Sequence, residues 1–372
     1  MTYELSPEEN EGWFQKYILP DFIKNSEPSE NPTFVLLTGQ SGAGKSFISE
    51  NYSKRMKVTP ILFGADDLRA KHPHTAEILQ KDEKNYPFLT KKDSGIWREK
   101  LVDWAIANKR NILIESILIS KDDWKMGTLM KLREAGYQTY CIAMGVHRFQ
   151  SLCGMFLRYE TQKAERGVGF PPTVEVHEKA YEYLGSICTN MLRHKTMDSV
   201  VICSRGGQVF YDSDKQSQTG VEIYSAINKA RNKIMTSSEI NKIFSQWETV
   251  FKLMDKRDAP MSDFREAKRH YDEFMYTSGL FLDQGISALP QKRQEMLANN
   301  DQLENNVFVI PPRIEAPIQK TDESNKNDTP PKLSGQQKVE NANDNNLENN
   351  KNAKPAKRIT GQTTDLGNQK TG

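Results

Sequence analysis

The stretch Thr33-Phe-Val-Leu-Leu-Thr38, followed by Gly39-Gln-Ser-Gly-Ala-Gly-Lys-Ser46, decides how this chain folds. The first part is a short apolar run typical of a buried strand. It leads directly into a glycine-rich loop that matches the phosphate-binding pattern GxxxxGK[ST]. A glycine-rich turn that matches by chance is the alternative. The apolar run before the loop and the helical pattern after it favour the phosphate-binding loop.

Each residue type in this loop has a physical role around a triphosphate. Glycine allows backbone N–H groups to point at phosphate oxygens. Lys45 brings a mobile positive charge to the β- and γ-phosphates, and the Ser46 hydroxyl is a ligand for Mg²⁺. The helix that begins here directs its positive end at the same anion. We therefore predict an ATP site, with Mg²⁺ on Ser46, formed by Gly39, Gln40, Ser41, Gly42, Ala43, Gly44, Lys45 and Ser46.

Composition excludes several classes of protein. Lysine and arginine number 51 against 49 aspartate and glutamate, a net charge of +2, so the chain lacks the broad basic field typical of nucleic-acid-binding proteins. The six histidines form neither an HExxH motif nor a Cys/His ligand set, which argues against a zinc site. Four scattered cysteines, no secretory leader and no bilayer-spanning apolar run predict a cytoplasmic protein without a membrane partner.

Apolar runs alternate with helical patterns between about residues 33 and 215. This alternation predicts an α/β fold, a doubly wound and mainly parallel sheet with flanking helices, as in P-loop kinases. Such sheets bind ligands beyond the carboxyl ends of their strands, where the phosphate loop lies. The predicted strands are residues 34–38, 61–63, 112–114, 137–144 and 200–203, with 208–211 as a hairpin strand.

Three flanking segments complete the predicted organisation around a kinase-like domain at 31–235. The N-terminal segment, residues 1–30, contains a helix over 6–25 that begins with the capping box Ser6-Pro-Glu-Glu9. The C-terminal segment 311–372 has no aromatic residue and too little apolar surface to fold, so it is predicted to be disordered. Its basic patch is interpreted as solvated, and a signal for delivery to another cell or for a partner is the alternative.

The segment 236–300 has a purely helical pattern. The capping box Thr236-Ser-Ser-Glu239 begins the first helix, and a second follows Asp258-Ala-Pro260. Each carries an aromatic stripe, which is typical of buried helix faces. We interpret the segment as a helical hairpin docked on the sheet domain. A built-in regulator that covers the nucleotide site is the alternative.

Acidic residues follow two of the predicted strands. Asp66 and Asp67 come directly after the run Ile61-Leu-Phe-Gly-Ala, and Glu115 ends the run Asn111-Ile-Leu-Ile. A carboxylate beside a γ-phosphate can accept the proton of an attacking hydroxyl. A helix N-cap is the alternative for either aspartate, since both types of position favour Asp. The region 31–235 has no base-reading NKxD loop and no apolar strand ending in Asp-Glu, which argues against switch GTPases and motor ATPases.

The predicted helix 148–165 contains Arg158, which borders an apolar face. Phosphoryl transfer concentrates negative charge between donor and acceptor, and an arginine that enters this region stabilises that charge. A surface ion pair is the alternative role for a single arginine. Glu99, on the helix before the third strand, is either solvated or part of the site.

These motifs together resemble the zeta toxin family, bacterial P-loop kinases of toxin–antitoxin systems. The resemblance covers about residues 30–215. The matching motifs, in chain order, are Gly39–Ser46, Asp66-Asp-Leu-Arg-Ala-Lys-His72-Pro73, Ile114-Glu115, Arg158-Tyr-Glu160 and His177.

The resemblance implies transfer of the ATP γ-phosphate to the 3′-hydroxyl of UDP-N-acetylglucosamine, an activity that makes the protein a toxin. It also implies that Asp66 is the general base, that Glu99 and Glu115 bind the acceptor, and that Arg158 contacts the phosphates. An antitoxin protein docks on the N-terminal helix of such toxins, here residues 6–25.

The chain departs from the family pattern at two places. A second arginine is usual about a dozen residues after the one matching Arg158, but here Phe170 lies near that place and Arg166 is the nearby arginine. Ile117 replaces a hydroxyl residue that often helps to hold the acceptor, and Thr128 lies close to another such position. Relatives with other acceptors exist, among them kinases of nicotinamide dinucleotides.

Two functional hypotheses follow. The first is a kinase in which Lys45, Arg158 and Arg166 stabilise the transferred phosphoryl group and Asp66 takes the proton, with UDP-N-acetylglucosamine, or a related small molecule such as NAD, as acceptor. The second is a nucleotide-gated binding or effector protein, in which ATP occupancy switches the helices of 236–300.

Overall fold

One six-stranded sheet organises this computed structural model, which describes residues 3–125, 127–216 and 218–278. The strand order is β2-β3-β1-β4-β5-β6, in which β1 to β5 are parallel and β6 runs antiparallel to β5. The predicted parallel sheet and its terminal hairpin strand are therefore confirmed. The strands are β1 (Thr33–Thr38), β2 (Ile61–Gly64), β3 (Ile112–Ser116), β4 (Gln138–Met144), β5 (Ser199–Cys203) and β6 (Val209–Asp212).

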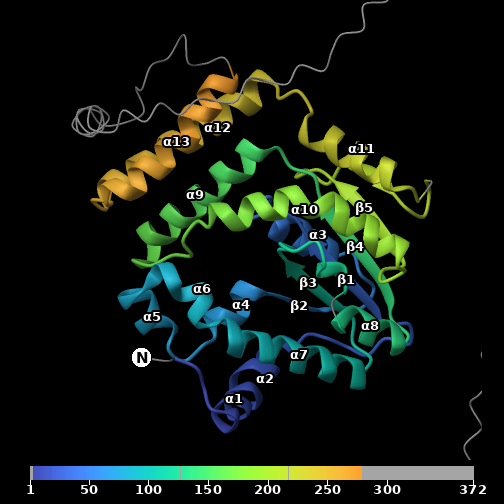
Figure 1. Ribbon diagram of the computed structural model, residues 1–372. Helices are drawn as coiled ribbons and strands as arrows, with labels where there is room; N and C mark the ends of the chain where they lie inside the picture. Colours follow the sequence, from blue (N-terminus) through green and yellow to red (C-terminus); the bar gives the residue numbers. More distant parts are fainter. Residues whose placement is uncertain (1–2, 126, 217, 279–372) are drawn as a thin grey trace, which may run out of the picture. The chain divides into compact units, whose positions relative to one another are not determined.

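Helices connect the parallel strands and flank the sheet (Figure 1). Each strand-to-helix crossover returns the chain to the same edge, so all five parallel strands end on the side where the phosphate loop lies. The helical elements are α1 (Pro7–Trp13), η1 (Phe14–Ile18), α2 (Leu19–Ile23), α3 (Lys45–Ser53), α4 (Ala65–Ala70), α5 (Thr75–Lys81), η2 (Glu83–Asn85), α6 (Tyr86–Leu89), α7 (Lys91–Ala107), η3 (Asp123–Lys125), α8 (Gly127–Glu134), α9 (Arg148–Arg166), α10 (Val174–Arg193), α11 (Gly220–Arg231), α12 (Ser237–Lys256) and α13 (Met261–Ser278).

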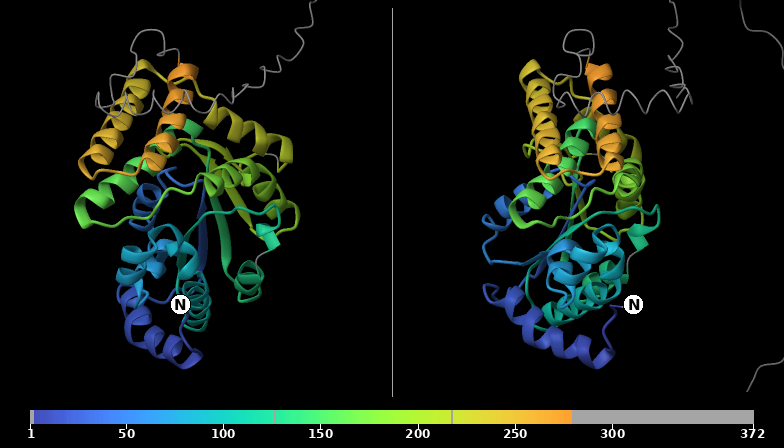
Figure 2. Two further views of the ribbon diagram at one scale, coloured as in Figure 1. Left: turned by 60° about the vertical axis from the view of Figure 1, so that its left-hand side comes forward. Right: turned by 90° about the vertical axis from the view of Figure 1, so that its left-hand side faces the viewer.

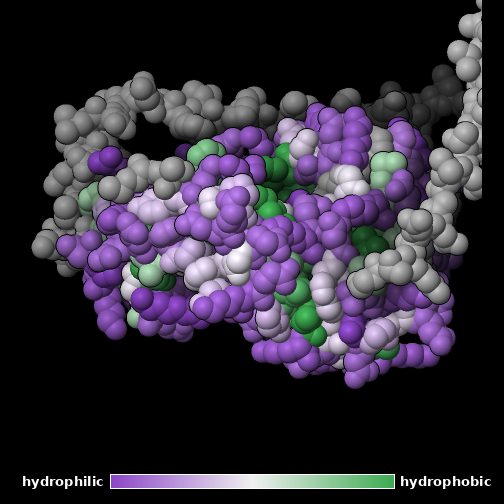
Figure 3. Space-filling model, turned by 90° about the horizontal axis from the view of Figure 1, so that it is seen from below, coloured by the Kyte–Doolittle hydropathy of each residue, from purple (hydrophilic) through white to green (hydrophobic). Residues whose placement is uncertain are grey.

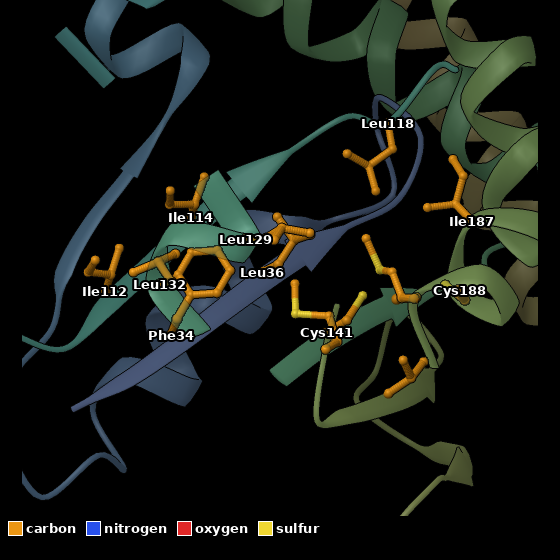
Figure 4. Packing of buried hydrophobic residues seen from close by; sticks show 14 of the residues in the cluster. Phe34, Leu36, Ile112, Ile114, Leu118, Leu129, Leu132, Cys141, Ile187 and Cys188 are labelled. Atoms are coloured by element: carbon orange, nitrogen blue, oxygen red, sulfur yellow. The ribbon is translucent and has the colours of Figure 1, made fainter. Parts of the chain in front are cut away.

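The two faces of the sheet bury alternate residues of the same strands. Phe34 and Leu36 of β1 pack with α7, α8, α10 and α11 on one face, whereas Val35 and Leu37 pack with α3 on the other. Figure 4 shows the first of these faces, with Cys141 of β4 close to Cys188 of α10. Strands buried on both faces read as continuous apolar runs, which is why the sequence pattern located them.

The N-terminal segment forms a helix, but not a regular one. The capping box is present, because the Ser6 hydroxyl accepts from the Glu9 backbone N–H and the Glu9 carboxylate accepts from the Ser6 N–H. The middle turn, η1, is π-helical. Pro20, two residues after the end of this turn, lacks the N–H that an α-helical turn needs, which explains the wider turn. Phe14 and Ile18 of η1 join the core below the sheet.

The helices α12 and α13 pack against α9 (Figure 2). They form a separate apolar cluster with Phe149, Leu152 and Phe156 of α9, centred on Trp247. The hairpin therefore contacts the sheet domain through α9. The rest of the predicted extension, 279–300, and the predicted tail, 311–372, lie outside the described residues. In the described part of the chain, no helix combines the length and the apolar character that a bilayer crossing needs.

Candidate active site

The glycine-rich loop joins β1 to α3 as predicted. Gly42 and Gly44 have φ angles of 73° and 93°, a left-handed conformation that side chains disfavour. The Lys45 ammonium donates hydrogen bonds to the carbonyl oxygens of Gly39 and Gln40, at 3.0 and 3.1 Å. Burial lowers the pKa of Lys45 from 10.5 to about 8. Left-handed glycines followed by a lysine that folds back over the loop are the features expected of a phosphate-binding loop.

Helix α9 lies directly against the loop. A Cβ atom on Gly42 would come within 2.0 Å of the Ser151 carbonyl oxygen, so only glycine permits this approach. The buried Gln40 amide donates to the Ser151 hydroxyl, at 3.2 Å, and to the Val146 carbonyl oxygen, at 3.0 Å. Ser151 is in turn 2.8 Å from Nε2 of His177 on α10. The matching histidine of the sequence motif therefore supports the loop through Ser151.

The two aspartates after β2 have different surroundings. The Asp67 carboxylate accepts a hydrogen bond of 2.7 Å from the Gly64 N–H and caps α4, and burial raises the pKa of Asp67. The Asp66 carboxylate is 3.0 Å from Arg69 and 3.8 Å from Arg158. The structure thus assigns the cap to Asp67 and leaves the Asp66 carboxylate directed at the arginine of α9.

Glu115 at the end of β3 reaches back to the phosphate-loop helix. Its carboxylate accepts hydrogen bonds from the hydroxyls of Ser46, at 3.1 Å, and of Ser49. Ser46 is the predicted Mg²⁺ ligand, so Glu115 lies on the phosphate side of the site. The acceptor role that resemblance implies for Glu115 stays a prediction, and Ser49 is a neighbour that the sequence motif did not reveal.

Glu99 and Thr128 meet although 29 residues separate them. The Thr128 hydroxyl on α8 donates to the Glu99 carboxylate on α7, at 3.0 Å to the nearer oxygen. Arg98 also donates to Glu99, at 2.8 Å. A carboxylate and a hydroxyl side by side are suited to holding sugar hydroxyls, and their role in acceptor binding remains a prediction.

Four predicted residues act on one another electrostatically. The charges of Glu115 and Asp66 raise the pKa of Lys45 while that of Arg158 lowers it, against the larger effect of burial. These four side chains come from α3, α4, β3 and α9, which the parallel sheet brings to one edge. Among the described residues, no cluster of three or more His, Cys, Asp or Glu side chains could hold a metal ion.

The predicted second arginine is not near this group. Arg166 is exposed at the last position of α9, about 12 Å along the helix axis from Arg158. Phe170 stacks on Tyr86 of α6, with ring centroids 5.5 Å apart. Its uncharged ring cannot replace the positive charge of the expected arginine. The contribution of Arg166 to phosphate binding therefore stays a prediction without a contact that supports it.

Two arginines that the sequence analysis did not single out lie at the site. Arg69 pairs with Asp66, and Arg205 lies against Gly44 of the loop. Arg69 is part of the Asp–x5–His-Pro motif, so its spacing of three residues from Asp66 on one helix was a usable signal. Arg205 follows the predicted fifth strand, and only its place at the carboxyl end of that strand could have pointed to it.

Comparison with known proteins now decides the family. The sequence profile described as Zeta toxin matches residues 20–216, more than half of the 372-residue chain. The chain belongs to the zeta toxin family. Its fold is P-loop kinase-like, in agreement with the sheet and loop described above, and members of the zeta toxin family are kinase-like enzymes.

Three relatives illustrate how far the similarity extends. Toxin PezT of Streptococcus pneumoniae is 30% identical over 142 residues, which are 38% of this chain and 56% of PezT. Toxin zeta of Streptococcus pyogenes is 22% identical over 65% of this chain and 84% of its own length. A solved structure from the PezAT chromosomal toxin–antitoxin system of Streptococcus pneumoniae aligns with a TM-score of 0.59 and 21% identity, covering 68% of this chain and 99% of that one. That alignment supports the fold.

Proposed function

We propose that this zeta toxin family member is an ATP-dependent kinase that phosphorylates the 3′-hydroxyl of UDP-N-acetylglucosamine and thereby acts as a toxin. The observation that carries the proposal is the position of the Asp66 carboxylate. It is 3.8 Å from Arg158, and its charge raises the pKa of Lys45 against the larger lowering by burial. A base, a cation for the transferred group and a phosphate-loop lysine are the parts that phosphoryl transfer needs.

The proposed reaction gives each of these residues a role. The phosphate loop and Lys45 hold the triphosphate, and Arg158 stabilises the negative charge on the transferred group. The acceptor hydroxyl oxygen forms a bond to the γ-phosphorus while the bond from that phosphorus to the β–γ bridging oxygen breaks. The hydroxyl proton moves to the Asp66 carboxylate, and ADP leaves.

The residues present fit a magnesium ion. The Ser46 hydroxyl and the Glu115 carboxylate offer hard oxygen donors that already lie 3.1 Å apart. One or two protein oxygens are typical of Mg²⁺ sites, since phosphates and water supply the remaining ligands. When bound there, Mg²⁺ would neutralise charge on the β- and γ-phosphate oxygens.

The acceptor is tested directly. Purified full-length chain is incubated with MgATP and UDP-N-acetylglucosamine, and the sugar nucleotide is analysed by mass spectrometry. We expect a mass gain of one phosphate, and loss of that gain in Asp66→Asn. A sugar nucleotide that stays unmodified at high enzyme concentration contradicts this acceptor.

A second acceptor class is favoured by one observation. Phe170, stacked on Tyr86, occupies the place near which a second arginine is expected, so the phosphate region differs from the family pattern. NAD is therefore assayed in parallel with the sugar nucleotide. Phosphorylation of NAD alone would assign the chain another nucleotide-type acceptor in place of the sugar nucleotide. ATP binding without turnover of either acceptor would favour a nucleotide-gated effector.

An antitoxin partner belongs to the same proposal. The N-terminal helical segment lies on the lower side of the molecule in Figure 1, and the surface seen from below in Figure 3 is mostly hydrophilic with small apolar patches. Tyr17 of η1 is 41% exposed and offers an aromatic contact on that segment. We expect Tyr17→Ala to weaken co-purification with an antitoxin while kinase activity is retained, and unchanged co-purification contradicts this docking site.

A further inference from the structure

Arg205 lies beside the phosphate loop although 161 positions in the sequence separate it from Gly44. It follows β5 and begins the turn to β6, on the edge of the sheet where the parallel strands end. A Cβ atom placed on Gly44 would be 3.2 Å from the Arg205 Cγ and 3.3 Å from its Nε. The side chain therefore covers the last glycine of the loop.

The same guanidinium also lies against α9. A Cβ atom on Gly154 would be 3.6 Å from both terminal nitrogens of Arg205. Gly154 lies one helical turn before Arg158, and residues four apart share a helix face. The Arg205 guanidinium therefore lies beside α9 one helical turn before Arg158, and both arginines lie beside the loop.

Arg205 has no carboxylate partner among the described residues. Its one hydrogen bond there is a long one, 3.5 Å from Nη1 to the Gln150 carbonyl oxygen. In contrast, Arg148 contacts two carboxylates and so does Arg257. Arg205 is nonetheless half-buried, and burial lowers its pKa. A guanidinium removed from water without a counter-ion is unfavourable, and an anion beside the loop would compensate for it.

We propose that Arg205 binds the phosphates of the nucleotide at the glycine-rich loop. The ligand class is a nucleoside di- or triphosphate, so the inference rests on the proposed function and adds a residue to it. Arg205 supplies a second positive charge next to that of Arg158. This charge comes from the β5–β6 turn, whereas the segment after α9 holds Phe170 near the place of the expected second arginine.

Isothermal titration of the full chain with ADP tests the contact without turnover. Arg205→Met keeps the apolar stem that packs on Gly44 and removes the charge. We expect its affinity for ADP to fall at least tenfold, which is the range of a charge-assisted hydrogen bond. Arg205→Lys keeps a charge but not the planar fork, and we expect a smaller loss. Arg193→Met, at the exposed end of α10, is the matched control and binds ADP like the parent.

The outcomes separate this inference from the proposed function. Parent protein that binds no ADP contradicts the nucleotide site itself. Parent protein that binds ADP, with Arg205→Met binding equally well, contradicts only the role of Arg205. Thermal unfolding of each variant is measured without ligand. If Arg205→Met and Arg205→Lys lose the same ADP affinity as each other, and both are also destabilised equally, Arg205 is a packing residue. That result overturns the proposal.

Discussion

Arg257, directly after α12, holds both carboxylate oxygens of Glu160 on α9, at 2.7 and 2.8 Å. Glu160 is 1% exposed and lies two residues beyond Arg158. The pair therefore fixes the rotation of α9 at the level where its arginine faces Asp66. It links the C-terminal helices to the candidate active site by charge as well as by the apolar cluster around Trp247.

The first prediction concerns this ion pair. Arg257→Ala leaves a buried carboxylate without its main partner, so we expect the free energy of unfolding to fall by about 3–5 kcal/mol. Urea denaturation measures the change. Replacing both residues by methionine removes the charge and should recover much of the loss. As a control, Lys179→Ala breaks an exposed pair with Glu175 and should have a much smaller effect on stability. Equal losses for Arg257 and Lys179 would contradict the assignment.

The second prediction separates the adjacent aspartates. Asp66→Asn should lower the transfer rate by about 10²- to 10⁴-fold, because the proton acceptor is lost, with little change in stability. Asp67→Ala removes the cap of α4 and should cost about 1 kcal/mol of stability. Steady-state kinetics and thermal unfolding of the two variants are compared. A large rate loss in Asp67→Ala together with normal rates in Asp66→Asn would reverse the two roles.

The sequence predicted the elements that local pattern determines. Buried strands read as apolar runs, and the phosphate loop has a fixed spacing, so the sheet and the loop were predictable. That Asp67 and not Asp66 caps α4 was not, because both satisfy the same local preference and only the Gly64 N–H distinguishes them. Contacts such as Glu160 with Arg257, 97 residues apart, have no local signature.

The contact made by the C-terminal hairpin illustrates the same limit. Aromatic stripes reveal that a helix face is buried, but they do not say against which element. The aromatic stripe of α12 packs on α9, and the apolar residues of the two helices form one buried cluster. The predicted active-site residues Glu99 and Thr128 likewise came from resemblance, and their mutual hydrogen bond became visible only in three dimensions.

The third prediction concerns the pH dependence of nucleotide binding. Burial holds the pKa of Lys45 at about 8 in the folded protein, against 10.5 for a lysine side chain exposed to water. Between these values the unfolded chain binds more protons, so the contribution of Lys45 to stability rises with pH. A bound polyphosphate favours the charged lysine instead. ADP affinity should therefore be constant below about pH 8 and fall above it, by at most tenfold per pH unit.

Isothermal titration with ADP from pH 7 to pH 10 measures this dependence. Lys45→Met provides the control, because it should bind weakly and with no such decline. An affinity of the parent that stays constant to pH 10 would show that Lys45 does not lose its proton in this range. The same result would contradict a pKa of about 8 for Lys45 in the folded protein.

The fourth prediction compares two glycines with similar positive φ angles. Gly42 and Gly167 have φ angles of 73° and 75°, so alanine introduces similar strain at both, about 1–2 kcal/mol. A Cβ on Gly42 would lie 2.0 Å from the Ser151 carbonyl oxygen, whereas one on Gly167 meets nothing within 4 Å. Gly42→Ala must therefore push α9 away from the loop. We expect it to lose ADP binding while Gly167→Ala retains it, and equal affinities in the two variants would contradict the close packing of α9 on the phosphate loop.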